Sequence, residues 1–423
     1  MNKITCILLI SALLLSGCGT LESMPTPPAV TVRPTADAAE TAAPETEIQA
    51  AVTAAAPAHG VLIRMEHGST EAYDPENHST RILSMEWDTV RVDNPGYPEA
   101  ADRINEALAA MEDAWYTGNS SSGADICGYN NLLSAAEDDY GVTREYGGEI
   151  REYSAAWDVS VLRADERVCV FLVREYYYLG GAHGSFLDQA LCFDTTSGER
   201  LSLDGLSENP EALKATLVNE MLKLAEADEG GYYTEHLSFV EKEDYAEAFR
   251  QLLRDGSWFA GNDAFWIFSD LYELAPYASG ITEFGIPYDS LNLRYAPLPA
   301  EQVSGSLRLE ELGTAAVGST EIVDRVCVHE NGLTCLLICE GRVEDLTVET
   351  GIYMENGFVP ENQLYYCDYL QNSALQLELA FAGDLPDTMV RYRDAGGAKE
   401  QFISMSGLDG SLILTDNVPL AGE

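Results

Sequence analysis

The chain has 423 residues, of which 24 are basic and 70 are acidic, so its formal net charge at pH 7 is -46. This charge excludes nucleic acid as a partner, because phosphate binding needs clustered Lys and Arg side chains that the chain lacks. The partners that remain are cationic, such as a basic protein, a polyamine or a divalent metal ion, although a large net charge also serves solubility alone.

The N-terminus predicts a lipoprotein signal peptide. Residues 1–3 carry a Lys, residues 4–15 are almost entirely apolar, and the small residues Ser16 and Gly17 precede Cys18. This pattern resembles a bacterial lipoprotein signal, and the resemblance implies that Cys18 is lipidated and becomes the mature N-terminus. We therefore expect a lipid-anchored protein on the extracytoplasmic face of the bacterial cell membrane. The alternative is an ordinary secretory signal or N-terminal anchor with a chance cysteine.

Residues 18–59 predict a disordered tether, because they consist largely of Ala, Thr, Pro and Glu in low-complexity order. Such a segment buries too little apolar surface to offset the entropy lost on ordering. The remaining chain, about 360 residues, is long enough for two or three domains with hydrophobic cores.

Residues 60–165 predict a first α+β subdomain. Strands are expected at 82–87 and 90–92, and again at 155–162 after a Ser/Gly-rich loop. From Pro98 onward, apolar side chains recur at steps of three and four residues, which is the spacing of one helix face. The side chains on this face are Ile104, Leu108, Met111 and Trp115.

Residues 166–298 predict a second α+β subdomain. A long hairpin is expected from 167–178 and 186–193, joined by a Gly-rich connection. Two amphipathic helices and three short strands follow in the predicted order. The helices are expected at 209–227 and 243–254, and the strands at 265–267, 271–273 and 282–286. This order is typical of an α+β fold in which helices pack on an antiparallel sheet.

Several short motifs then carry a more specific resemblance. They are Tyr97-Pro98, Tyr178-Leu179-Gly180-Gly181-Ala182-His183, Phe193-Asp194, Ala275-Pro276-Tyr277-Ala278-Ser279-Gly280 and Ile286-Pro287-Tyr288. In this order, over about residues 61–295, they resemble the paired extracytoplasmic domains of anti-sigma-V factors. The same pair precedes the catalytic domain of a peptidoglycan deacetylase. The resemblance implies a non-catalytic recognition module of the Gram-positive cell surface, which in anti-sigma-V factors binds lysozyme and serves as a sensor.

Within these motifs, the candidate binding residues are Tyr178, Gly180, Gly181, His183 and Tyr277. The imidazole of His183 could instead ligate a metal or relay protons, but the Gly residues beside it are explained by the backbone of a tight turn. The six histidines form no pair at i, i+3 or i, i+4 spacing, so we expect no metal site and no cofactor.

The chain departs from an anti-sigma factor at its N-terminus. Only residues 1–3 precede the apolar run, so we expect neither a sigma-binding segment nor signalling across the membrane by this chain alone. It also shows no Asp and His cluster of the deacetylase kind after the shared domains.

Residues 301–423 predict a small all-β, sandwich-like domain of short strands with Asn-Gly and Asp-Gly turns. If strands 326–328 and 333–338 form a hairpin, Cys327 would lie opposite Cys335, and an exported protein could form that disulfide. Buried reduced thiols are the alternative.

The sequence leaves three classes of function open. The leading hypothesis is a surface-anchored, non-catalytic lipoprotein that recognises a cationic lysozyme-like protein or the glycan of peptidoglycan. The alternatives are a hydrolase that modifies the cell wall and a structural envelope protein. A cleft with convergent carboxylates of shifted pKa would favour the enzyme, whereas a flat aromatic or acidic patch would favour binding.

Overall fold

The computed structural model describes residues 57–119, 128–148, 151–228, 231–297, 303–311, 320–329, 332–354, 357–380, 386–406 and 410–416. The predicted signal peptide, Cys18 and almost all of the predicted tether lie outside the described residues. Residues 57–423 group into one compact unit. This unit combines large, mainly antiparallel sheets with a few helices, which confirms the predicted α+β class.

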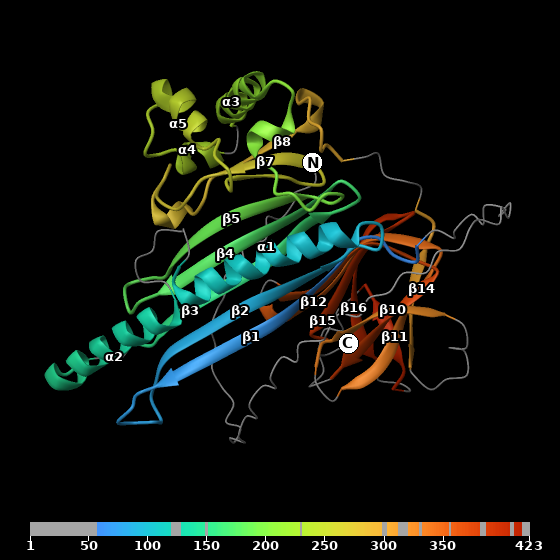
Figure 1. Cartoon of the computed structure of the whole chain (residues 1–423), viewed down its shortest axis with the longest axis horizontal. Coiled ribbons are helices and arrows are strands. Elements are labelled where there is room, and N and C mark those ends of the chain that lie inside the picture. The colour runs from blue at the N-terminus through green and yellow to red at the C-terminus, as the bar shows by residue number, and fades with distance from the viewer. Residues whose placement is uncertain are drawn as a thin grey trace, which may run out of the picture. The chain divides into compact units, whose positions relative to one another are not determined.

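A ten-stranded sheet is the framework of the part of the chain that the structure describes (Figure 1). Its strand order is β17-β16-β15-β12-β13-β1-β2-β3-β4-β5. The strands form because apolar and polar residues alternate along them, as in β3, where every second residue from Tyr153 to Val161 is buried. The bounds are β1 Leu62–Tyr73, β2 Arg81–Asp93, β3 Tyr153–Ala164, β4 Val168–Tyr178, β5 Ser185–Asp194, β12 Arg342–Met354, β13 Gly357–Gln371, β15 Thr388–Asp394, β16 Gly397–Met405 and β17 Leu412–Thr415.

Helices α1 (Pro98–Thr117) and α2 (Tyr129–Tyr146) connect β2 to β3 and cover one face of the sheet. As predicted, α1 begins with Pro in its first turn and buries Ile104, Leu108 and Trp115, and it ends at Gly118 in the left-handed conformation. The ring of Trp115 packs on Trp157 of β3, with centroids 5.9 Å apart. The helical connection makes β2 and β3 a parallel pair in an otherwise antiparallel neighbourhood.

A small three-stranded sheet follows the predicted hairpin β4–β5. Its strands are β6 (Trp258–Ala260), β7 (Ala264–Phe268) and β8 (Glu283–Pro287). With the helices beside it, this sheet forms a second core against Val168, Val170 and Cys192 of β4 and β5. The helices are α3 Pro210–Glu226, α4 Tyr232–His236 and α5 Tyr245–Gln251, with 3-10 turns at Leu203–Leu206, Lys242–Asp244, Tyr277–Ser279 and Tyr288–Ser290.

The predicted strand at 271–273 is wrong. These residues form a turn, in which Tyr272 adopts a left-handed conformation with φ of 63°. An aromatic residue rarely takes this conformation, which lies outside the β region of a regular strand. The apolar pattern of the segment misled the prediction, because Leu271 and Tyr272 are partly exposed turn residues.

The C-terminal region is β-rich, as predicted, and packs as a sandwich. A four-stranded sheet, in the order β10-β14-β11-β9, shares a core with the β12–β17 part of the large sheet, including Leu337, Leu375 and Val390. Its strands are β9 Ser306–Glu311, β10 Glu321–Cys327, β11 Leu333–Glu340 and β14 Ser373–Leu379. The sandwich shares its second sheet with the N-terminal strands, because Leu62 to Arg64 of β1 pair with β13.

The predicted hairpin that would bring Cys327 opposite Cys335 does not form. Strand β14 lies between β10 and β11 and pairs with both, so that Cys327 is opposite Glu378 and Cys335 is opposite Leu377. Two strand spacings separate β10 from β11, about 10 Å, whereas a disulfide joins Cα atoms about 4.4–6.8 Å apart. Cys335 is a buried thiol, and burial raises its pKa to about 12.

A buried arginine joins the large sheet to the three-stranded sheet. Arg163 near the end of β3 is 0% exposed. Its Nη1 atom donates to the carbonyl oxygens of Ala260, Gly261 and Tyr295 at 3.3, 3.4 and 3.0 Å. Its Nε atom donates to Asp165 at 2.7 Å. The Arg163 side chain therefore fastens two parts of the segment 258–295 to the end of β3.

In the described ranges, no helix has the length and apolarity that crossing a membrane requires.

Candidate functional site

Three side chains from two loops form an aromatic cluster, defined here as His183, Tyr272 and Tyr277, and Tyr178 at the end of β4 supports the hairpin tip that carries His183. The imidazole of His183 stacks on the ring of Tyr277, with centroids 3.9 Å apart and an interplanar angle of 21°. The ring of Tyr272 lies beside Tyr277 at 5.8 Å. The fold thus brings two of the sequence motifs, residues 178–183 and 275–280, into direct contact.

Hydrogen bonds hold the hairpin tip that carries His183. The Tyr178 hydroxyl donates to the carbonyl of Gly181 at 3.1 Å, and Arg151 donates to the carbonyls of Gly180 and Gly181 at 2.8 and 3.0 Å. Gly180 has φ of 71°, which glycine adopts without strain. The two glycines therefore shape the turn and present backbone carbonyls to Arg151.

The ring nitrogens of His183 have distinct partners. Its Nδ1 lies 2.8 Å from the carbonyl oxygen of Gly184, which can only accept, so Nδ1 carries the proton. Nε2 is then the acceptor for the Tyr272 hydroxyl at 3.4 Å. His183 therefore bridges the hairpin and the turn.

The cluster leaves aromatic surface open to a ligand. Tyr272 is 51% exposed, and nearby Phe239, whose backbone nitrogen donates to the carbonyl of Leu274 at 3.0 Å, is 57% exposed. Backbone strain such as that at Tyr272 concentrates at functional sites. Sequence reasoning missed both residues. The only signal for Tyr272 was its position three residues before the Ala275 motif.

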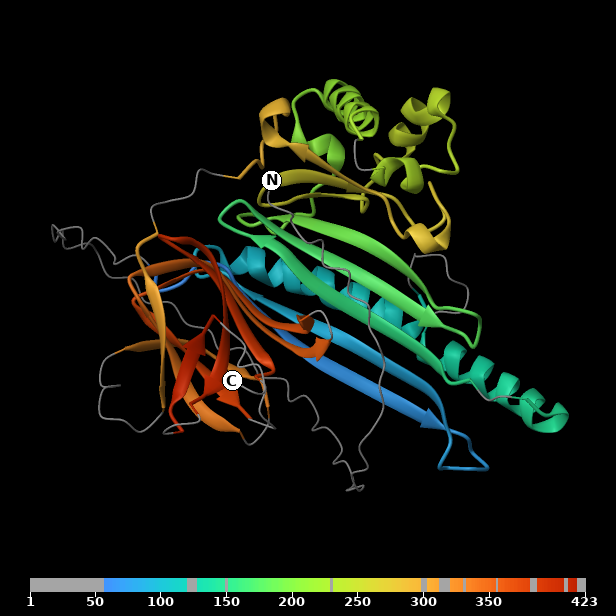
Figure 2. The same cartoon turned by 180° about the vertical axis from the view of Figure 1, so that it is seen from behind.

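The aromatic cluster borders the face of β1–β5 opposite α1 and α2, and the three-stranded sheet packs on the part of this face that carries Val168, Val170 and Cys192. Figure 2 shows this face in front, with α1 behind it. Residues that alternate along a strand, and their cross-strand partners, share one face of a sheet. By register, Tyr178 and Tyr176 of β4 therefore share this face with Ser154 and Ala156 of β3.

A charged row, defined here as His67, Asp88, Asp158, Arg174 and Asp188, crosses the same face. The register pairs His67 with Asp88, Asp158 with Arg174, and Arg174 with Asp188. The β2–β3 ladder ends at Trp87 and Trp157, one residue before Asp88 and Asp158. The row therefore lies where these two strands begin to separate.

Two ion pairs occupy most of the charged row. Arg174 binds Asp188 in a bidentate pair, with both nitrogen–oxygen distances 2.7 Å, and its guanidinium lies over the ring of Phe186 at 4.2 Å. His67 Nδ1 pairs with Asp88 Oδ1, and Asp88 Oδ2 accepts a hydrogen bond from the Val159 nitrogen at 2.9 Å.

Asp158 lies between these pairs, and the described residues supply it with no hydrogen bond or ion pair. Burial, followed by the neighbouring Asp88 carboxylate, raises the pKa of Asp158 to about 7. For His67, partial burial acts to lower the pKa, but the hydrogen bond and charge of Asp88 outweigh it and raise the pKa. Asp158 thus titrates near neutral pH, and the pKa of His67 lies above its ordinary value.

Replacing Asp158 by Asn should raise the melting temperature at pH 8, with a gain that shrinks towards pH 4. The pKa is about 7 in the folded protein and about 3.9 in an unfolded chain, so the unfolded state loses its proton first as the pH rises. Stability therefore falls across this window in the parent protein, and Asn removes that loss. Calorimetry of the parent protein and of the variant at pH 5, 6, 7 and 8 measures the difference in melting temperature. Asp188→Asn, which strips Arg174 of its partner, should instead lower the melting temperature, and a loss in both variants would contradict this prediction.

A second carboxyl with a raised pKa lies away from this face. Burial, and then the charges of Asp165 and Asp345, raise the pKa of Asp368 on β13 to about 8. Asp345 itself binds the Tyr366 hydroxyl at 3.0 Å and Arg393 at 3.1 Å. These contacts join β12, β13 and β15 of the sandwich.

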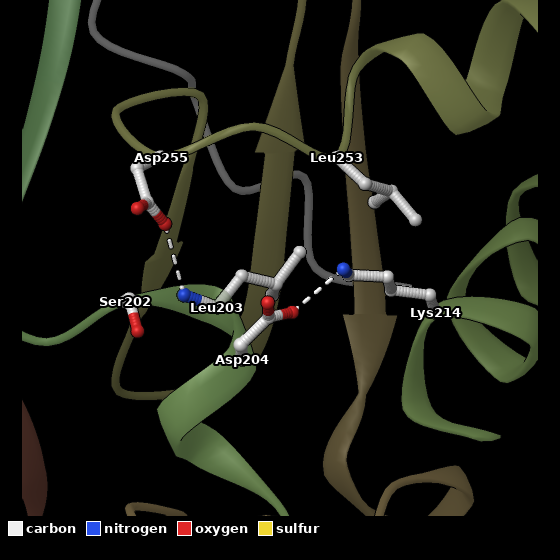
Figure 3. Close-up of a pocket in the computed structure, with 6 residues that line it drawn as sticks. All are labelled: Ser202, Leu203, Asp204, Lys214, Leu253 and Asp255. Carbon is white, nitrogen blue, oxygen red and sulfur yellow. Dashed lines mark hydrogen bonds and ion pairs between the residues drawn. The ribbon is translucent and has the colours of Figure 1, made fainter. Parts of the chain in front are cut away.

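Two small hollows lie beside α3 and contain neither the aromatic cluster nor Asp158. One, of about 140 Å³, is drawn in Figure 3, where Lys214 pairs with Asp204 at 2.6 Å and Asp255 accepts from the Leu203 nitrogen at 2.9 Å. The other, of about 220 Å³, lies between the start of α3 and residues 290–292. Both are smaller than the roughly 300–1,000 Å³ of typical small-molecule sites.

Among the residues that the structure covers, no group of three or more His, Cys, Asp or Glu side chains is arranged to hold a metal ion.

Comparison with known proteins places one family model on this region. Residues 207–289 match the family described as "Protein of unknown function (DUF3298)". The match includes α3, the three-stranded sheet and the Tyr272–Tyr277 turn, whereas the hairpin with Tyr178 and His183 lies before it.

Two solved structures are similar to parts of the chain. One is a DUF3298 family member from Bacteroides fragilis, with 15% identity and a TM-score of 0.40, covering 55% of this chain and 92% of that one. The other is a DUF3298 family protein from Pseudomonas aeruginosa, with 18% identity and a TM-score of 0.35, covering 55% of this chain and 95% of that one. No curated protein sequence matches the chain.

Proposed function

We propose that this protein is a lipid-anchored, non-catalytic recognition module that binds a cationic extracellular protein on the face of β1–β5 opposite α1 and α2, beside the three-stranded sheet. The observation that carries the proposal is the juxtaposition of carboxylates and exposed aromatic rings on that face. Aromatic rings supply contact area at an interface and attract the cations of Arg and Lys. The resemblance to anti-sigma-V factors makes a lysozyme-like protein the first ligand to test.

The charge of the face supports a cationic partner. Arg174 already pairs with Asp188, and Glu86 and Glu71 extend the row of carboxylates along β2 and β1. Glu71 pairs with Arg81, whereas Glu86 is exposed. Together with a net charge of -46, this distribution would attract a basic protein and speed its association.

The geometry favours binding over catalysis. Asp158, the carboxyl of the face that titrates near neutral pH, is half-buried on the sheet and does not line either hollow beside α3. An enzyme that cleaves a wall polymer would be expected to place such a group in a cleft opposite a second carboxyl. Carboxylates bordered by exposed aromatic rings support recognition instead.

The aromatic cluster also favours a second candidate ligand, the glycan of peptidoglycan. Tyr272, Tyr277 and Phe239 present ring surface on which a sugar could stack. Binding of this kind depends little on salt, whereas attachment of a cationic protein to carboxylates weakens as salt screens the charges.

Anchoring through Cys18 completes the proposal. Lipidation there, followed by a tether to residue 59, would hold the recognition face outside the membrane. Radiolabelled palmitate should then enter the parent chain in a bacterial host and not the Cys18→Ser variant.

The test is binding of the full chain, in a neutral detergent, to hen lysozyme and to soluble peptidoglycan fragments at several salt concentrations. We expect saturable lysozyme binding that weakens with salt. Glu86→Gln should weaken it about two- to fivefold, the range of a single exposed ion pair. Glu106→Gln, an equally exposed change on α1 behind the sheet, should not. Salt-independent binding of glycan alone would favour the second candidate, and binding of neither would overturn the proposed function.

A further inference from the structure

Asp158 has both positively and negatively charged side chains around it, but the positively charged ones are already paired with other carboxylates. The groups that face it are His67 on β1, Glu86 and Asp88 on β2, Arg174 on β4 and Asp188 beyond Arg174 on β5. Arg174 gives both its Nε and Nη2 hydrogen bonds to Asp188, and His67 pairs with Asp88. Asp158 is left beside two carboxylates, with no donor of its own.

This arrangement makes ionisation of Asp158 more favourable when a new positive charge lies beside it. A half-buried carboxylate without a hydrogen bond is costly, and the nearby Asp88 and Glu86 add repulsion. An ammonium or guanidinium group placed on this face of the sheet would supply the donor and the charge that the row lacks. Below pH 7 the neutral carboxylic acid is then the main form of the free protein, and the carboxylate is the ligand-bound form.

We propose that binding of a cationic partner on this face is coupled to release of the proton of Asp158. The inference rests on the proposed function and adds its regulation by pH. On binding, the O–H bond of the Asp158 carboxyl breaks and the proton passes to the solvent, while the Lys or Arg of the partner keeps its own proton. The product is an ion pair in which Asp158 accepts a hydrogen bond from the partner.

The coupling predicts tighter binding as the pH rises. With the pKa of Asp158 at about 7 in the free protein, only about a tenth of the molecules carry the carboxylate at pH 6, and nearly all do at pH 8. A ligand that requires the carboxylate therefore binds about tenfold more weakly at pH 6 than at pH 8. Above pH 8 the affinity should level off.

His67 must be separated from Asp158, because the pKa of His67 is raised towards the same range. Loss of the His67 charge with rising pH would also favour a cationic ligand. The proton released on binding would then come from the imidazole, and His67→Gln would abolish the pH dependence. If the proton comes from Asp158, His67→Gln leaves most of it intact.

The test is isothermal titration of the full chain with hen lysozyme at pH 6, 7 and 8, in two buffers of different ionisation enthalpy, so that protons released are counted directly. The parent protein should release close to one proton at pH 6 and almost none at pH 8. Asp158→Asn should release none and bind with nearly constant affinity. Asp368→Asn is the matched control, because its carboxyl also titrates near neutral pH but lies away from the face, and it should behave as the parent does.

Each outcome separates the two proposals. Binding whose proton release persists in Asp158→Asn overturns the coupling and leaves the proposed function standing. Failure of lysozyme to bind at any pH overturns the proposed function and the coupling with it. Melting curves of each variant at the same pH values show whether a lost effect reflects unfolding.

Discussion

Replacing Arg163 by Met should lower the free energy of unfolding by about 3–5 kcal/mol, the range found when one member of a buried charged network is removed. Arg163 is fully buried and supplies donors to three backbone carbonyls and to Asp165. Met fills much of the same volume but donates nothing. The three carbonyls would then lose this donor in a buried environment, and the Asp165 carboxylate would keep only the backbone nitrogens of Arg167 and Val168 as donors.

Urea denaturation of the full chain, followed by tryptophan fluorescence, measures this loss. Arg250→Met is the matched control, because Arg250 is 59% exposed and pairs with Glu247 one helical turn away on the surface. Exposed pairs of this kind contribute about 0–1 kcal/mol. Equal stability of the two variants would show that Arg163 does not fasten the three-stranded sheet to β3.

Replacing Tyr277 by Ala should weaken lysozyme binding about 30-fold or more, which corresponds to a loss of about 2 kcal/mol at an interface hot spot. Tyr277 stacks on His183 and lies beside Tyr272, so its removal takes away ring surface and also the support of two neighbours. Isothermal titration at low salt measures the change.

Tyr146→Ala provides the comparison for Tyr277. Tyr146 is 77% exposed at the end of α2, a helix on the covered side of the sheet, so its truncation should leave the affinity unchanged. If both variants bind as the parent does, the aromatic cluster is not part of the interface. If both lose affinity equally, the contact surface lies elsewhere or extends around the sheet.

The regular elements were largely predictable because their patterns are local. The face of α1 shows the helical spacing of Ile104, Leu108 and Trp115, and the hairpin β4–β5 shows two apolar runs around a Gly-rich turn. Helix α2 was missed because its buried stripe is thin, with Leu132, Ala136 and Tyr140 among polar residues. Strands β12 and β13 were missed because charged and polar residues interrupt their apolar pattern.

Pairings between distant strands could not be predicted from the same patterns. Nothing local distinguishes a Cys327–Cys335 hairpin from the observed arrangement, in which β14 inserts between the two strands. The link between β1 and β13 joins residues about 300 positions apart, and its register depends on tertiary packing.

The sequence predicted the aromatic part of the candidate site but not the charged row. The motifs of His183 and Tyr277 stood out in the sequence, but their contact required the fold. The charged row contains ordinary Asp and Arg residues spread over five strands, and in a chain with 70 acidic residues no single one stands out. What distinguishes Asp158 is the absence of a donor among the described residues around it, a property that only the three-dimensional arrangement has.

Hydrogen exchange of the full chain, with and without hen lysozyme, tests the recognition face most directly. Lysozyme should slow exchange at the 178–184 hairpin tip and in the 270–280 turn, and leave α1 and α2 unchanged. Protection confined to α1 and α2, or to the C-terminal sandwich, would contradict the account, because the ligand would then occupy a surface without the aromatic cluster and the charged row.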